Sequence, residues 1–191
     1  EALVPAYRGK IPMVIKNTNN PKHPGTKIVL NHTDDNVKVV GIAGDSGFVS
    51  INTSKYLMNR EVGFGRKLLQ VLEDLNISWD HMPTGIDDLS IILRSKELTP
   101  IKEQEILKQL IQELQVDHAE IEHNLSIIMI VGENMKSQIG VTATATKALS
   151  ENNINIQMIS QGSSEVSIMF VVNQEQEKQA IKALYDAFFK N

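Results

Sequence analysis

The chain has 191 residues, of which 41% are hydrophobic, enough for one ordinary domain or for two small domains with separate cores. No apolar run approaches the roughly 20 residues of a membrane span, and no basic region followed by an apolar one marks a signal peptide. The net charge is −4 with Lys and Arg scattered, so no basic patch predicts nucleic-acid binding. Cysteine is absent, which excludes disulfides, zinc–thiolate sites and thiol catalysis. A cytoplasmic location fits this composition.

Residues 1–35 are rich in Pro, Asn, Gly and His, which is typical of loops. The short apolar pieces 12–15 and 28–30 have the composition of strands. The segment carries too little apolar surface to form a core alone. Because the chain also begins at Glu1 rather than Met, we expect a fragment whose first 35 residues are the end of another domain.

The rest of the chain contains an internal repeat. A shift of 77 residues, without gaps, places similar residues on one another. This spacing is too long for a solenoid repeat and suits two copies of a small domain. The matched pairs are Met58 with Met135, Gly63 with Gly140, Leu72 with Leu149, Asn76-Ile77 with Asn153-Ile154, Gly85 with Gly162, and Ser90-Ile91 with Ser167-Ile168.

The first copy reads as β-α-β-β-α-β, the ferredoxin-like order. Alternation predicts a strand over 47–53, and helical spacing predicts a helix over 62–75. Strands follow at 77–82 and 89–93 around a turn at Thr84-Gly85. A helix over 101–114 has Thr99 as its N-cap and Pro100 in its first turn. The last strand falls within 116–123.

The second copy has a strand over 125–131, a helix over 139–150, strands over 154–159 and 166–172, and a helix over 174–189. Its closing strand is missing, and the strand over 37–43 is left unassigned. The prediction is therefore an α+β fold of two ferredoxin-like modules, the first inserted within the second. The first module spans 44–124, and the second comprises 37–43 plus 125–191.

These patterns resemble the paired ACT domains of aspartate kinases. Each copy has a Met-x-x-x-(Val/Ile)-Gly turn into a helix, at 58–63 and 135–140, and an Asn-Ile-x-(Trp/Ile) strand. Residues 154–162 are similar to the family's second module. Residues 11–26 are similar to the closing strand and loop of its kinase domain. The order and spacing of these motifs cover essentially the whole chain.

The resemblance implies a parent enzyme that transfers phosphate from ATP, with Mg, to the side chain of aspartate, the first step towards lysine, threonine and methionine. The family's Lys-Phe-Gly-Gly-type motif and any Walker-type phosphate loop are absent. We therefore expect the chain itself to bind a free amino acid without catalysis or cofactor, and to form a homodimer through its ACT modules. The alternative is a stand-alone ACT-repeat regulatory protein without a kinase.

An amino-acid effector needs N–H donors for its carboxylate and an anionic acceptor for its ammonium. A loop entering a helix supplies the donors, and Asp80 supplies an anion. The acidic residues nearby make lysine the preferred effector, with threonine also considered. The resemblance implies that the first module binds it through Met58, Glu61, Val62, Gly63, Ser78, Trp79, Asp80, Thr84 and Asp88.

The second module has Gln157 and Gln138 where the first has Asp80 and Glu61. An amide binds an ammonium less strongly than a carboxylate does. This module is either a weaker site for an uncharged amino acid such as threonine, or a structural partner. The five histidines lack a compact ligand spacing, so no metal site is predicted. The residues of this second candidate site are Met135, Ile139, Gly140, Asn155, Ile156 and Gln157.

Overall fold

The computed structural model describes residues 3–29, 39–136 and 138–190, and the chain divides into two compact units, Glu1–Lys38 and Val39–Asn191. In the first unit, helix α1 (Leu3–Arg8) precedes strand β1 (Met13–Ile15), which pairs antiparallel with β2 (Thr26–Ile28). None of its described residues is buried, in keeping with a segment too poor in apolar surface to form a core. The predicted second strand continued to Leu30, which lies outside the described residues.

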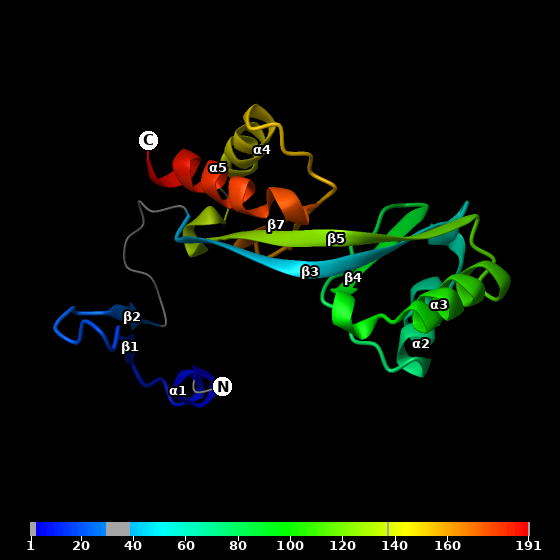
Figure 1. The fold of residues 1–191 in the computed structure, drawn as a ribbon, viewed down its shortest axis with the longest axis horizontal. Helices are drawn as coiled ribbons and strands as arrows, with labels where there is room; N and C mark the ends of the chain where they lie inside the picture. The colour runs from blue at the N-terminus through cyan, green and yellow to red at the C-terminus, as the bar shows by residue number, and fades with distance from the viewer. Residues whose placement is uncertain (1–2, 30–38, 137, 191) are drawn as a thin grey trace. The chain divides into compact units, whose positions relative to one another are not determined.

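The second unit is built on one antiparallel sheet of five strands in the order β4-β3-β5-β7-β6 (Figure 1). Its centre is a pair of 14-residue strands, β3 (Gly41–Ser54) and β5 (His118–Val131), which lie side by side along their lengths. The shorter strands are β4 (Asp88–Arg94), β6 (Met158–Gln161) and β7 (Ser167–Asn173).

In two places, two strands that were predicted separately form one continuous strand. Residues 41–43 and 47–53 of the first two predictions lie in β3; residues 37 and 38 are not described, and residues 39 and 40 precede the strand. Residues 118–123 and 125–131 of the other two predictions lie in β5, and residues 116 and 117 precede it. The β3–β5 register shifts between Ser46 and Ser50, where Gly47 and Asn124 take positive φ angles of 83° and 60°. These two residues have turn-type composition, but they form an irregularity within the ladder rather than a turn.

The register shift divides the sheet into halves. The second part of β3 pairs with β4 and with the first part of β5. The first part of β3, from Gly41 to Ser46, pairs with the second part of β5, which also pairs with β7. This is the pairing that an inserted first module requires, although the sheet is continuous and the exact module boundaries stay a prediction.

Each half carries two helices, at opposite ends of the long β3–β5 pair in Figure 1. Helices α2 (Phe64–Asp74) and α3 (Pro100–Gln112) belong to the first half, and α4 (Val141–Glu151) and α5 (Glu177–Phe189) to the second. As predicted, the Thr99 hydroxyl caps α3 by accepting from the Lys102 N–H at 3.4 Å. Among the described residues, no helix is long and apolar enough to cross a membrane.

Three helices begin later than predicted. Gly63 and Gly140 are the N-caps of α2 and α4, with φ angles of 82° and 93°. The chain therefore enters each helix through a left-handed residue, and Val62 and Ile139 remain outside it with exposures of 96% and 95%. The C-terminal helix α5 likewise starts at Glu177, because Gln174–Gln176 forms a 3₁₀ turn.

Three apolar clusters hold this unit together. One lies under α2 and α3, around Leu68 and Ile91, and another under α4 and α5, around Leu149 and Phe170. The third lies on the helix-free face of the sheet and joins the halves; it consists of Phe48, Ile92, Leu125, Ile127 and Val171.

The prediction of a strand over 77–82 is wrong. Only isolated bridges form in this part of the chain, one between His81 and Ile92 and one between Thr84 and Leu89. Between them Pro83 accepts from the Ser90 N–H at 3.0 Å but has no N–H to return. The ladder is therefore interrupted. In the second half, position 160 is Ser, and β6 forms as a regular strand.

Candidate effector-binding site

The loop from β3 into α2 meets the turn before β4 at one end of the sheet. Ser54, the last residue of β3, pairs with Asp88, the first residue of β4. The Lys55 N–H donates to the Asp87 carbonyl at 2.9 Å. Met58 begins a 3₁₀ turn in this loop and is only 6% exposed, within the core under α2. The fold thus brings the segments 55–63 and 84–88 together.

Glu61 is engaged by two lysines. Its carboxylate oxygens lie 2.6 Å from Lys55 Nζ and 2.6 Å from Lys67 Nζ. Lys55 and Lys67 hold the pKa of the Glu61 carboxyl below its ordinary value. Lys55 Nζ also donates to the Leu114 carbonyl at 2.7 Å. Glu61 therefore organises this loop, and its charge is already countered before any ligand ammonium arrives.

The turn at 84–88 carries two acidic side chains. The Gly85 N–H donates to the Asp88 carbonyl at 2.9 Å. Asp88 is exposed, whereas the Asp87 Oδ1 atom is buried without a hydrogen-bond partner in the described part of the chain. A buried carboxylate oxygen without a donor is costly, so this atom can accept from a ligand.

Ser78 and Trp79 lie elsewhere, in a hollow of about 510 Å³. The hollow is lined by the end of α2 and the following residues, including Glu73 and Asn76, together with Glu97. Trp79 is 45% exposed there. These two predicted residues therefore face the far end of α2 rather than its start.

Asp80 occupies a third position. Its N–H donates to the Ile92 carbonyl at 2.8 Å, four residues along β4 from Asp88. At about 3.4 Å per residue, that separation is about 14 Å along the strand. Its Oδ2 atom lies 4.0 Å from Arg94 Nε. We expected Asp80 beside the start of α2; the strand pairing places its backbone away from that end of the sheet.

A hollow of about 480 Å³ in the second half brings two predicted residues together. Met135 and Gly140 line it with Gln138, just before α4, with Gln161, the last residue of β6, and with Gly162. Its polar side chains include two neutral amides. Gln161 and Gly162 are lining residues that the sequence prediction did not include.

The other predicted residues of the second half lie outside this hollow. Ile139 is exposed to solvent, and Ile156 packs against the core under α4 and α5. Asn155 lies beside it, in the segment between α4 and β6. Gln157 donates from Nε2 to Glu122 Oε1 at 2.5 Å, so it contacts the first half of the sheet.

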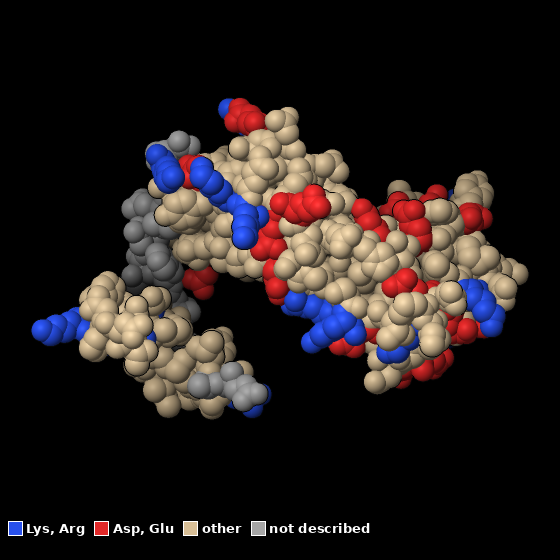
Figure 2. All heavy atoms as spheres, viewed as in Figure 1, with Lys and Arg blue, Asp and Glu red and all other residues tan. Residues whose placement is uncertain are grey.

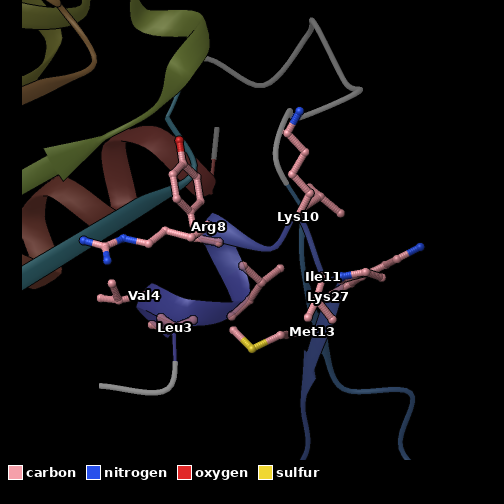
Figure 3. Close-up of a pocket in the computed structure, with 11 residues that line it drawn as sticks. Leu3, Val4, Arg8, Lys10, Ile11, Met13 and Lys27 are labelled. Atoms are coloured by element: carbon pink, nitrogen blue, oxygen red, sulfur yellow. The ribbon is translucent and has the colours of Figure 1, made fainter.

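Outside these two hollows, the described surface carries acidic side chains (Figure 2) and a further hollow. Acidic side chains are prominent on the face of the Val39–Asn191 unit drawn in Figure 2. Within the described ranges, no three His, Cys, Asp or Glu residues are grouped to hold a metal ion. The Glu1–Lys38 unit has a mainly apolar hollow of about 630 Å³ between α1 and its hairpin, lined by Leu3, Val4, Ile11 and Met13 among others (Figure 3).

Comparisons with known proteins identify the family. A family model described as "ACT domain" matches residues 128–188. The chain is 52% identical to Aspartokinase 3 of Bacillus subtilis over 189 residues, which are 99% of this chain and 42% of that protein. The aspartate kinase structure from Clostridium acetobutylicum is 38% identical, with a TM-score of 0.90, over 98% of this chain and 44% of that one. The chain is homologous to the regulatory region of aspartokinases.

The fold comparison agrees with this assignment. The regulatory subunit of aspartate kinase from Thermus flavus has a TM-score of 0.68 at 22% identity, covering 79% of this chain and 99% of that chain. The α+β fold of ACT-type modules is therefore confirmed, and the relatives do not support a stand-alone protein. The chain spans less than half the length of the Bacillus relative.

Several residues of this regulatory region escaped the sequence prediction. Lys55, Lys67 and Arg94 are ordinary surface cations in the sequence. They are separated from their acidic partners by 6 to 49 residues, so no helical i,i+4 spacing indicates the pairs. Asp87 stands beside Asp88 in the sequence, but only the structure shows that its Oδ1 atom is buried.

Proposed function

We propose that this chain is the effector-binding part of an aspartate kinase, with L-lysine as its effector and L-threonine as the second candidate. The parent protein would phosphorylate aspartate with ATP and Mg in the cytoplasm, and this chain would regulate it as a homodimer. The proposal is supported by the aspartokinase relatives and by one geometric observation. That observation is the convergence of the loop 55–63 and the acidic turn 84–88 at one end of the sheet.

The ligand chemistry follows from these two segments. Segment 55–63 leads into the N-terminal end of α2, whose N–H groups favour a carboxylate. Turn 84–88 offers Asp87 and Asp88 as acceptors for an ammonium. Lysine carries a second ammonium, and Asp80, farther along β4, would add a negative charge that attracts it. Glu61 is assigned to loop organisation in this arrangement because two lysines already bind it.

A thermal-shift screen of the chain against the twenty amino acids and meso-diaminopimelate tests the proposal. Ligand at about 100 times its dissociation constant stabilises a fold by about 2.7 kcal/mol, so lysine should raise the melting temperature clearly. No shift with lysine or threonine would contradict the proposal. A companion assay should find no aspartate-dependent ADP formation by the purified chain.

Replacing Asp80 with Ala should weaken lysine binding about two- to fivefold, since a charge interaction at an exposed position is worth about 0.2–1 kcal/mol. The matched control is Gln157→Ala at the corresponding repeat position. It should lower the melting temperature through loss of the Glu122 contact while leaving lysine affinity nearly unchanged. Lysine affinity equal to that of the unmodified chain in Asp80→Ala would remove Asp80 from the site.

The hollow beside α4 suggests a second effector position. Gln138 and Gln161 offer amide groups there, and Gln138 takes the position that corresponds to Glu61, while Glu165 is the acidic residue of the lining. Neutral amides suit an uncharged amino acid such as threonine. Titration calorimetry with threonine should show a binding heat that Gln161→Ala abolishes and Asp80→Ala leaves intact. An equal loss of this heat in both variants would show that there is one effector site rather than two.

A further inference from the structure

One guanidinium lies between two carboxylates on the helix-free face of the sheet. Arg94, the last residue of β4, donates from Nη2 to Asp45 Oδ2 at 2.6 Å. Its Nε atom lies 4.0 Å from Asp80 Oδ2. Arg94 is directly opposite Phe48 in the β3–β4 register, and its guanidinium carbon lies 4.1 Å from the centre of that ring. The ion pair and the cation–π contact together fix the guanidinium.

The two carboxylates belong to different halves of the sheet. Asp45 lies in the first part of β3, opposite Ile127 of β5. Asp80 lies opposite Ile92 in the first half. The β3 register shift falls between Asp45 and the β4 pairing. Arg94 therefore connects the segment of Asp80 to the strand that the second half uses.

The same two positions meet in the other repeat without a cation. Asp45 and Glu122 are 77 residues apart, as are Asp80 and Gln157. Gln157 donates directly to Glu122 at 2.5 Å. The counterpart of Arg94 is Val171. An amide can donate to a carboxylate, whereas two ionised carboxylates repel each other and need a cation between them.

The Arg94–Asp80 interaction is one of charge alone. At 4.0 Å it is too long for a hydrogen bond. The Asp80 backbone is held independently, through the Ile92 carbonyl. Removing the guanidinium therefore leaves the Asp80 backbone anchored but takes away its nearby positive charge.

The contact of Arg94 with Asp45 and Asp80 is here called the joint between the two halves. We propose that Arg94 is a positioning and specificity residue that makes this joint responsive to a cationic effector. An ammonium held at Asp80 replaces the positive charge that Arg94 supplies there. Arg94 then pairs with Asp45 alone. In the part of the chain that the structure describes, the Gln157–Glu122 contact is a direct hydrogen bond without a bridging cation, so a ligand has no cation to replace there. The part of this inference that concerns the ligand rests on the proposed function.

The joint itself can be tested without ligand, by urea unfolding of the 191-residue chain. Arg94→Val should lower the folding equilibrium constant about two- to fivefold, because Asp45 and Asp80 are left facing each other at an exposed position. The double variant Asp80→Gln, Arg94→Val reproduces the Gln of the Gln157–Glu122 contact and its neighbour Val171. It should recover most of the lost stability through a contact between the new Gln and Asp45. If the double variant is as unstable as the two single effects added together, or if Arg94→Val costs nothing, the joint does not exist.

The ligand part is tested by lysine titration at low salt. Arg94→Gln should bind lysine about three- to tenfold more tightly than the unmodified chain, and the gain should shrink at high salt because screening weakens the charge effect. In the Asp80→Asn background, Arg94→Gln should change nothing. The matched control Lys108→Gln removes an exposed charge on α3 and should leave affinity unchanged.

Two outcomes would overturn the ligand part: unchanged or weaker binding in Arg94→Gln, or an equal gain in the Asp80→Asn background. Failure of the unmodified chain to bind lysine would refute both the proposed lysine effector and a lysine-responsive joint. The unfolding experiment would still decide whether Arg94 joins the halves.

Discussion

His81 illustrates how burial of one side chain makes stability depend on pH. Its Nε2 atom is buried without a partner among the described residues, and desolvation lowers the pKa of the imidazole from its ordinary value of 6.5. The unfolded chain therefore binds more protons than the folded chain as the pH falls below about 6.5, and stability must fall with it. Replacing His81 with Gln should flatten this part of the stability–pH curve in urea unfolding.

The control for this pH prediction is His23→Gln, in the other compact unit, which should leave the curve of the Val39–Asn191 unit unchanged. Stability that rises on acidification from pH 7 to pH 5.5, or an unaltered slope in His81→Gln, would show that the imidazole charges freely in the fold.

Gly63 and Gly140 test the backbone at the two helix starts. A Cβ at either position would meet no atom within 4 Å, so the cost of alanine comes from the positive φ angles alone. Gly63→Ala and Gly140→Ala should each destabilise the chain by about 1–2 kcal/mol in urea unfolding. Gly65→Ala, within α2 and equally open, should instead stabilise it by up to about 1 kcal/mol. Equal effects of all three substitutions would contradict this account.

At the scale of elements, the sequence predicted most helices and strands because each repeat has clear apolar periodicity. It divided β3 and β5 in two because Gly47 and Asn124 look like turn residues, and local composition does not distinguish an irregularity in a long ladder from a turn. The site was predicted less well. The segments 55–63 and 84–88 are brought together by strand pairing, while the positions of Asp80 and Trp79 depend on an interrupted edge that periodicity does not reveal.

Pro83 offers a direct test of that interrupted edge. Replacing it with Ser, the residue at position 160 of the other repeat, supplies the N–H that can donate to the Ser90 carbonyl. Hydrogen exchange should then show a protected amide at position 83 and slower exchange at Ser90, with a regular strand joining His81 to Thr84. Rapid exchange at both positions in Pro83→Ser would mean that something other than proline interrupts the ladder.

At the scale of the whole molecule, the sheet leaves β6 as an edge strand, and exposed edges tend to pair with other chains. We expect a symmetric dimer by light scattering at tens of micromolar protein. Ile159 is 45% exposed on β6, so Ile159→Lys places a charge on this edge and should shift the chain towards monomer. Ile111→Lys, at a 46% exposed position on α3, should leave the dimer intact. A monomeric mass for the unmodified chain, with and without lysine, would refute self-association; a dimer that survives Ile159→Lys would place the interface away from β6.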